Sequence, residues 1–89
     1  MALESIAFKE ALLKFEDDLA DVRSDLYEAL NEKLPAARVK RIVAAGQKKL
    51  ADYDALLAKL SGTQRKTAEG EFSEQVDTIR ERVEQLTRA

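Results

Sequence analysis

The sequence predicts an all-α protein, an up-down-up three-helix bundle with coiled-coil-like packing. Hydrophobic residues recur every three or four positions along most of the chain, and the strict alternation typical of strands is nowhere sustained. Only one proline and three glycines occur, and Pro35 and Gly62 divide the chain into three segments of similar length. An alternative is a helical hairpin with a third helix, in which oligomerisation covers the remaining apolar surface.

The first helix is predicted over residues 3–33, because two hydrophobic stripes run along it side by side. The residue before a proline is disfavoured in helices, so Pro35 ends this helix. The two stripes and Leu30 span roughly 160° at 100° per residue, more than one neighbour covers, so we expect two neighbouring helices. The first stripe, a heptad seam, is Phe8, Leu12, Phe15, Leu19, Val22, Leu26 and Ala29. The second stripe is Ile6, Leu13, Ala20, Tyr27 and Leu34.

The second helix is predicted over residues 35–60, with Pro35 in its first turn, where a missing N–H does no harm. Gly46 falls on its seam, although a glycine inside a helix costs about 1 kcal/mol relative to alanine. We interpret Gly46 as a point of close approach between helices, with a functional kink as the alternative. Ser61-Gly62 is a typical stop signal. The predicted seam is Val39, Val43, Gly46, Leu50, Tyr53, Leu57 and Leu60.

The third helix is predicted over residues 63–88, with a frayed or bent first part around Gly70. Its hydrophobic stripe is only one residue wide. A stripe this narrow cannot cover both the second stripe of the first helix and the Ile42/Leu56 flank of the second. We therefore predict that a symmetric homodimer covers the remainder. The stripe is Phe72, Val76, Ile79, Val83 and Leu86.

The composition limits the classes of function. Eighty-nine residues, 1–89, are enough for one domain, and 45% hydrophobic with 36% charged residues is typical of neither a disordered nor a membrane protein. No apolar run is longer than that of residues 42–45, which is far too short to span a bilayer, so no membrane partner is expected. There is no cysteine, and a reducing, cytoplasmic setting is the expectation.

Histidine is absent as well, which excludes Ser-His and Cys-His catalytic pairs and histidine metal motifs. Acidic residues one turn apart, such as Asp17 and Asp21, could chelate a divalent ion only weakly, and a solvated helix face is the simpler interpretation. We therefore expect no enzyme, no catalytic residue, no cofactor and no metal site.

Charge is segregated along the chain although the net charge is only −2. Residues 34–66 hold eight basic residues against two acidic ones, and the first helix is acidic. We name two groups of residues as the candidate partner-binding surface. The basic stretch is Arg38, Lys40, Arg41, Lys48 and Lys49, and the acidic ridge is Asp18, Asp21, Asp25, Glu28 and Glu32.

The simplest role for these charges is pairing within the bundle. In an antiparallel hairpin turning near Pro35, residues whose numbers sum to roughly 69 lie level, which brings Lys49 beside Asp18. The same rule for the second and third helices predicts two further contacts: Asp77 with Lys48 or Lys49, and Glu84 with Lys40 or Arg41.

The sequence thus favours a small non-enzymatic module for protein–protein interaction or assembly, acting through helix faces as a homo-oligomer. The alternative is a nucleic-acid-associated regulator that uses the basic stretch within residues 38–49. Nucleic acid is the weaker choice, because the acidic ridge repels phosphate and only five aromatic residues are present for base stacking.

Overall fold

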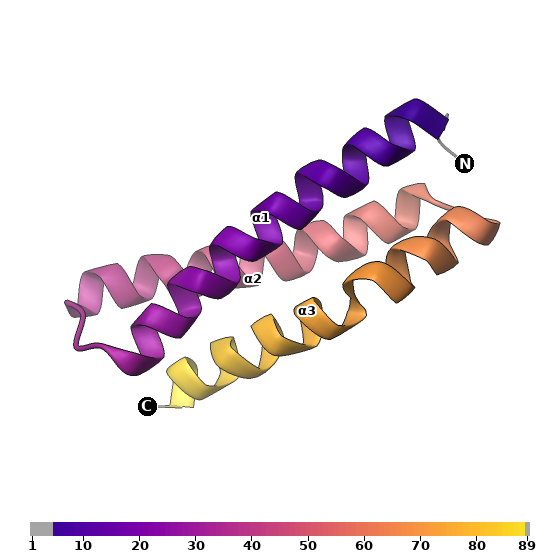
Figure 1. Cartoon of the computed structure of the whole chain (residues 1–89). Helices are drawn as coiled ribbons and strands as arrows, with labels where there is room; N and C mark the ends of the chain where they lie inside the picture. Colours follow the sequence, from indigo (N-terminus) through magenta and orange to yellow (C-terminus); the bar gives the residue numbers. More distant parts are fainter. Residues whose placement is uncertain (1–4, 89) are drawn as a thin grey trace.

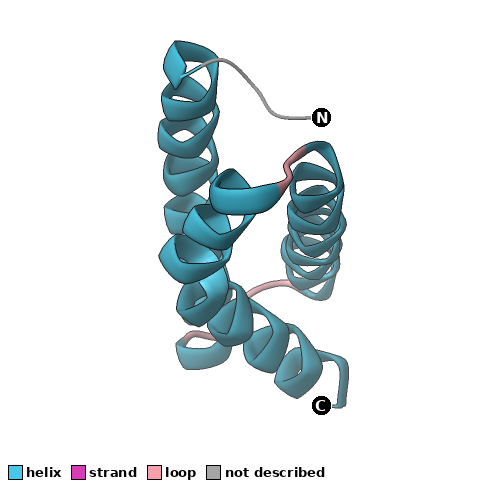
Figure 2. Ribbon diagram, turned by 90° about the vertical axis from the view of Figure 1, so that its right-hand side faces the viewer, coloured by secondary structure: helices cyan, strands magenta, loops and turns pink. Residues whose placement is uncertain are grey.

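Three long helices make up the fold. The computed structural model describes residues 5–88, which form α1 (Ser5–Asn31), α2 (Ala36–Lys59) and α3 (Gly62–Arg88), with no strand in that range (Figure 1). Each helix packs against the other two, and the chain runs up, down and up again, with short connections at opposite ends of the bundle (Figure 2). The predicted all-α three-helix bundle is confirmed. Residues 3 and 4 of the predicted first helix lie outside the described range.

The first connection follows from Pro35. α1 ends at Asn31, two residues before the predicted Lys33, and α2 starts directly after Pro35. Because Pro35 keeps Leu34 out of the helical region, the reversal needs an extended segment before α2 begins. Pro35 itself is extended, with φ −58° and ψ 143°, and its carbonyl accepts hydrogen bonds from the N–H groups of Arg38 (2.9 Å) and Val39 (3.1 Å).

The second connection is two residues long. Leu60 donates its N–H to the carbonyl of Leu57 at 3.1 Å and is extended, and Gly62 then takes a positive φ of 58°, which glycine adopts readily. α3 continues through Gly70 as an uninterrupted α-helix, so of the two alternatives predicted there fraying was wrong, and a bend stays a prediction. Ala68 and Phe72, both fully buried, hold the chain against the core on either side of Gly70.

The core contains one aromatic residue from each helix. The Phe15 ring of α1 stacks on Tyr53 of α2 at 6.1 Å between centroids and meets Phe72 of α3 edge-on at 5.1 Å. The predicted seams of α1 and α3 are buried or half-buried along their lengths. In α2 the buried stripe is rotated toward Ile42, which is 8% exposed, whereas Val43 on the predicted seam is only half-buried. The Ile42 flank is therefore covered, whereas Leu13 and Tyr27 of the second stripe stay exposed, so the prediction that both could not be covered is confirmed.

Gly46 lies where α2 packs tightly against side chains of both neighbouring helices. An ideal Cβ on Gly46 would lie 2.7 Å from Cγ2 of Val83 in α3 and 3.5 Å from Cδ1 of Leu26 in α1. Real Cβ atoms essentially never come as close as the first of these distances. The interpretation of Gly46 as a site of close helix approach is confirmed.

Candidate interaction surfaces

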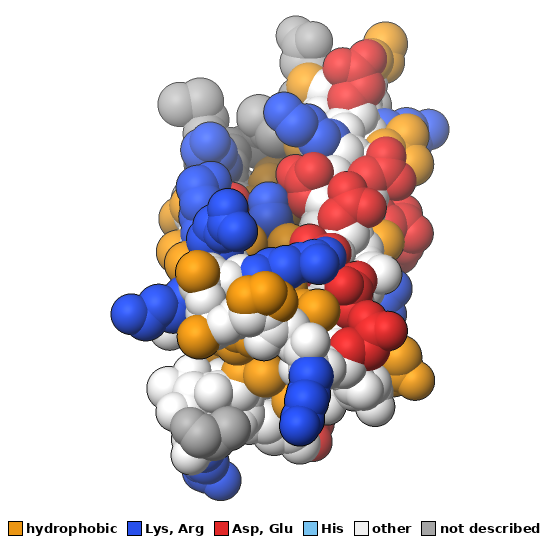
Figure 3. Space-filling view, turned by 90° about the vertical axis from the view of Figure 1, so that its left-hand side faces the viewer, with side chains coloured by type: hydrophobic (Ala, Val, Ile, Leu, Met, Phe, Trp, Pro, Cys, Tyr) orange, Lys and Arg blue, Asp and Glu red, His pale blue; other side chains and the backbone are white. Residues whose placement is uncertain are grey.

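The acidic ridge of α1 and the basic stretch of α2 lie side by side on the bundle. Figure 3 views the molecule from the left-hand side of Figure 1 and shows acidic and basic side chains in two adjacent bands. Antiparallel packing of α1 and α2 produces this arrangement, because the charged faces flank the same hydrophobic seam.

Two ion pairs join the ridge to the stretch. Lys49 Nζ lies 3.3 Å from Asp18 Oδ2, the contact that the level rule predicts, and Arg38 Nη2 lies 2.9 Å from Glu28 Oε1. The Lys49 side chain is only 14% exposed and its Nζ lies 5.7 Å from the centroid of the Phe15 ring. These contacts tie two of the five predicted cations to two of the five predicted acids.

Asp52 binds the two lysines at the C-terminal end of the basic stretch. Its Oδ2 lies 3.4 Å from Lys48 Nζ and 3.3 Å from Lys49 Nζ. Burial acts to raise the pKa of Asp52, but the hydrogen bonds and positive charges of Lys49 and Lys48 outweigh it. The pKa of Asp52 therefore lies below its ordinary value, and this carboxylate stays ionised at neutral pH.

Other charged residues of the candidate partner-binding surface have no ion pair within residues 5–88. Within residues 5–88, Lys40 and Arg41 of the basic stretch have no ion pair. The same holds in that range for three acids of the ridge, Asp21, Asp25 and Glu32.

The predicted contacts between α2 and the acids of α3 were wrong. Asp77 pairs with Arg80 at 3.0 Å, and Glu84 pairs with Arg88. Both partners lie on α3 itself, one turn away, and a neighbour three or four residues along a helix is within reach without any inter-helix approach.

A second surface lies on the other side of α1. Among the described residues, four large hydrophobic side chains are exposed, and all four belong to α1: Ile6 (73% exposed), Leu13 (63%), Tyr27 (59%) and Leu30 (37%). With the exposed Ala20 they form what we call the α1 stripe. The sequence predicted that this stripe and the Ile42/Leu56 flank could not both be covered, but not which of them stays exposed, since periodicity alone does not say how far a neighbouring helix reaches round.

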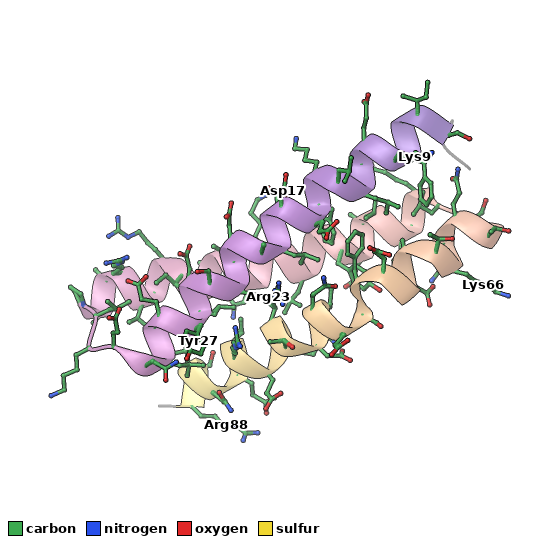
Figure 4. The ribbon with its side chains drawn as sticks, viewed as in Figure 1. Lys9, Asp17, Arg23, Tyr27, Lys66 and Arg88 are labelled. Atoms are coloured by element: carbon green, nitrogen blue, oxygen red, sulfur yellow. The ribbon has the colours of Figure 1, made fainter. Side chains whose placement is uncertain are left out.

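One end of the α1 stripe borders α3. Arg82 donates a hydrogen bond from Nη1 to the carbonyl of Arg23 at 2.9 Å, and its guanidinium lies 5.4 Å from the centroid of the Tyr27 ring. Figure 4 shows Arg23 and Tyr27 on the side of α1 toward α3, and Asp17 on the opposite side. Nε of Arg23 is buried and has no hydrogen-bond partner among residues 5–88.

Other kinds of site find no support in the described chain. Within residues 5–88 no group of three or more acidic, His or Cys side chains is placed to hold a metal ion. No helix in that range combines the length and the apolar character that a bilayer span needs. No protein-family model, curated protein or solved structure matches this chain.

Proposed function

We propose that the protein is a small, non-enzymatic helical module that acts by protein–protein interaction, with the α1 stripe as its binding face. One observation carries the proposal: all four large hydrophobic side chains exposed within residues 5–88 lie on this single helix. Large apolar side chains gathered on one face of a protein are typical of interaction sites.

The spacing of the α1 stripe suits a helical partner. Ile6, Leu13, Ala20 and Tyr27 are seven residues apart, so their side chains project from one side of the helix over about 31 Å at 1.5 Å per residue. A long and narrow apolar face of this kind is covered well by another helix packed along it.

A second copy of the same chain is the partner that we propose. A charge follows three residues after each of the first three members of the α1 stripe, in the order Lys9, Glu16 and Arg23. In an antiparallel pair of α1 helices with its two-fold axis at Ala20, Leu13 of each copy lies opposite Tyr27 of the other. Glu16 of each copy then comes within one residue of the level of Arg23 of the other, so the two copies complement each other in charge as well as in shape.

The test is the mass in solution. We expect light scattering at micromolar concentration to give about twice the 10.0 kDa of one chain. Leu13→Glu, which places a charge in the α1 stripe, should give single chains with an unchanged helical spectrum. Ser73→Glu adds the same charge at an exposed position of α3 and should leave the dimer intact.

The charges offer an independent check of the register. Glu16→Arg should weaken the dimer because it places like charges level, and Glu16→Arg combined with Arg23→Glu should restore it. A wild-type mass of one chain well above micromolar concentration would refute the homodimer. Dimers that survive Leu13→Glu would place the interface elsewhere.

The alternative, nucleic-acid binding through the basic stretch, has less support. Arg38, Lys48 and Lys49 already face acids of this chain, and Lys40 and Arg41 are left to meet phosphate. Two cations next to an acidic ridge can make only a few contacts with the phosphates of a duplex, and phosphate contacts supply most of the affinity.

A further inference from the structure

A groove of about 670 Å³ opens at the end of the bundle where α1 joins α2. It lies between the first half of α2 and the last turn of α3, and its floor is apolar. The end of the bundle that carries it faces the viewer in Figure 3, where hydrophobic and basic side chains lie together. The floor is formed by Leu34, Val39, Val43 and Leu86, all half-buried.

Small side chains account for the hollow. Ala29, Ala36 and Ala44 line it, and none of them is long enough to fill the space between the helix ends. Ala29 is 8% exposed, so the groove reaches from the surface at Ala44 to the buried edge of the core. An occupant must therefore be narrow: a helix with side chains is about 10 Å wide and stays outside, whereas a single alkyl chain can enter.

The groove has a basic rim whose two lysines are not paired with an acid of residues 5–88. Lys33 and Lys40 line it and form no ion pair within residues 5–88. Among the described residues that line the groove, Glu32 is the only acid, so the local charge is positive. The volume lies within the range of small-molecule sites, which combine apolar walls with a few polar groups.

A second hollow between α1 and α2 provides the contrast. It has about 280 Å³, and its lining includes Lys49 together with Asp18 and Asp52. Those two carboxylates hold Lys49 at 3.3 Å each. Lys14 and Lys59 also line this hollow and form no ion pair within residues 5–88. The groove at the α1–α2 connection differs in its volume of about 670 Å³, and neither of its two lysines is held by a carboxylate of residues 5–88.

We infer that this groove binds a single-chain amphipathic anion of the fatty-acid class. The alkyl chain lies on the floor of Val39, Val43 and Leu86, and the carboxylate lies between Lys33 and Lys40. A lysine–carboxylate contact fixes the orientation, and the chain supplies the affinity by leaving water. Each added methylene should tighten binding about fourfold, which follows from about 0.8 kcal/mol per buried CH₂.

Calorimetry with the full chain and octanoate, decanoate or dodecanoate tests this inference. We expect one saturable site per chain, with affinity rising about fourfold per methylene until the groove is full. Lys33→Glu and Lys40→Glu should each weaken dodecanoate binding tenfold or more. Lys59→Glu makes the same charge change on α2 beside the smaller hollow and should leave the affinity unchanged.

Two further variants distinguish binding inside the groove from binding at the α1 stripe. Ala44→Phe should block the groove and abolish dodecanoate binding while the helical melt is retained, because Ala44 is exposed. Leu13→Glu, which breaks the proposed dimer, should still bind dodecanoate. The proposal of a ligand groove and the proposal of a dimer interface are therefore tested independently.

Absence of saturable dodecanoate binding would overturn the inference. Equal weakening by Lys40→Glu and Lys59→Glu would do the same, because it would indicate general electrostatic attraction. Retention of the wild-type protein on phosphatidylserine-containing vesicles without binding of free dodecanoate would assign the basic rim to a membrane surface instead.

Discussion

Tyr53 is the polar member of the aromatic cluster, and its position gives it an unusual acid–base character. Its side chain is 8% exposed, and its ring stacks on Phe15. Burial raises the pKa of the Tyr53 hydroxyl above its ordinary value, and the nearby carboxylates of Glu69 and Asp54 raise it further. The fold therefore favours the neutral phenol.

This preference predicts a specific loss of stability in alkali. A pKa raised by folding gives stability that is complete below the unfolded value of about 10 and is lost as the pH rises through the folded value. We expect the free energy of unfolding of Tyr53→Phe, measured by urea titration from pH 9 to 12, to fall less steeply than that of the wild type. Lysine deprotonation contributes equally to both proteins.

Tyr27→Phe is the matched control, because Tyr27 is 59% exposed. It should retain the steep decline of the wild type. Identical pH profiles for all three proteins would mean that burial of the Tyr53 hydroxyl has no energetic weight.

At the scale of the helix, substitutions at two glycines distinguish the effect of helix propensity on stability from the effect of packing between helices. Gly70 lies within α3 and an added Cβ would meet nothing within 4 Å, whereas at Gly46 of α2 it would meet Val83 at 2.7 Å. Gly70→Ala should therefore stabilise the protein by about 1 kcal/mol through helix propensity alone.

At Gly46 a side chain would bring the same gain in helix propensity, but its clash with Val83 opposes that gain. We expect Gly46→Ala to be neutral or destabilising, and Gly46→Leu to destabilise by about 1–3 kcal/mol through overpacking against Val83. Val83 is β-branched and cannot move aside easily. Thermal and urea unfolding of the three variants measure these differences. A Gly46→Leu variant more stable than Gly70→Ala would contradict the close approach of the helices.

The sequence anticipated most of this helix-scale description, for identifiable reasons. Pro35 and the seven-residue seams specify helix ends within two residues. Because the α1–α2 connection is short, the rule that residues whose numbers sum to roughly 69 lie level correctly placed Lys49 beside Asp18. The rule failed for Asp77 because Arg80 on the same helix competes for it. Periodicity also did not reveal that Leu13 stays exposed while Ile42 is covered, since cover depends on how each helix is rotated against its neighbours.

The groove could not be predicted from periodicity for a related reason. Ala36 and Ala44 are ordinary helix formers in the sequence, and they become the wall of a hollow only where α3 comes to its last turn at Leu86. Of its two lysines, Lys40 was grouped by the sequence with a basic stretch that the fold divides. Lys48 and Lys49 form ion pairs with Asp52, whereas Lys40 lines the groove.

The whole molecule is an elongated rod with its charges arranged lengthwise. Residues 5–88 belong to a structure of 43 × 20 × 17 Å with a radius of gyration of 14.2 Å, compared with about 12 Å for a compact chain of this length. A rod exposes much surface for each residue in its core. The acidic ridge and basic stretch therefore present opposite charges side by side over a large part of one face.

This arrangement predicts how the molecule behaves toward a polyanion. A sulfated or phosphate chain that approaches Lys40 and Arg41 also meets the acids Asp21, Asp25 and Glu32 of the neighbouring helix, and the net charge of −2 opposes it at a distance. We expect the protein to pass through a heparin column at low salt, roughly 50 mM. The triple variant Asp21→Asn, Asp25→Asn and Glu32→Gln keeps every cation and removes the opposing acids, so it should be retained. Wild-type retention that weakens steeply as salt rises would instead favour the nucleic-acid interpretation of the basic stretch, because release of counterions from phosphate has that signature.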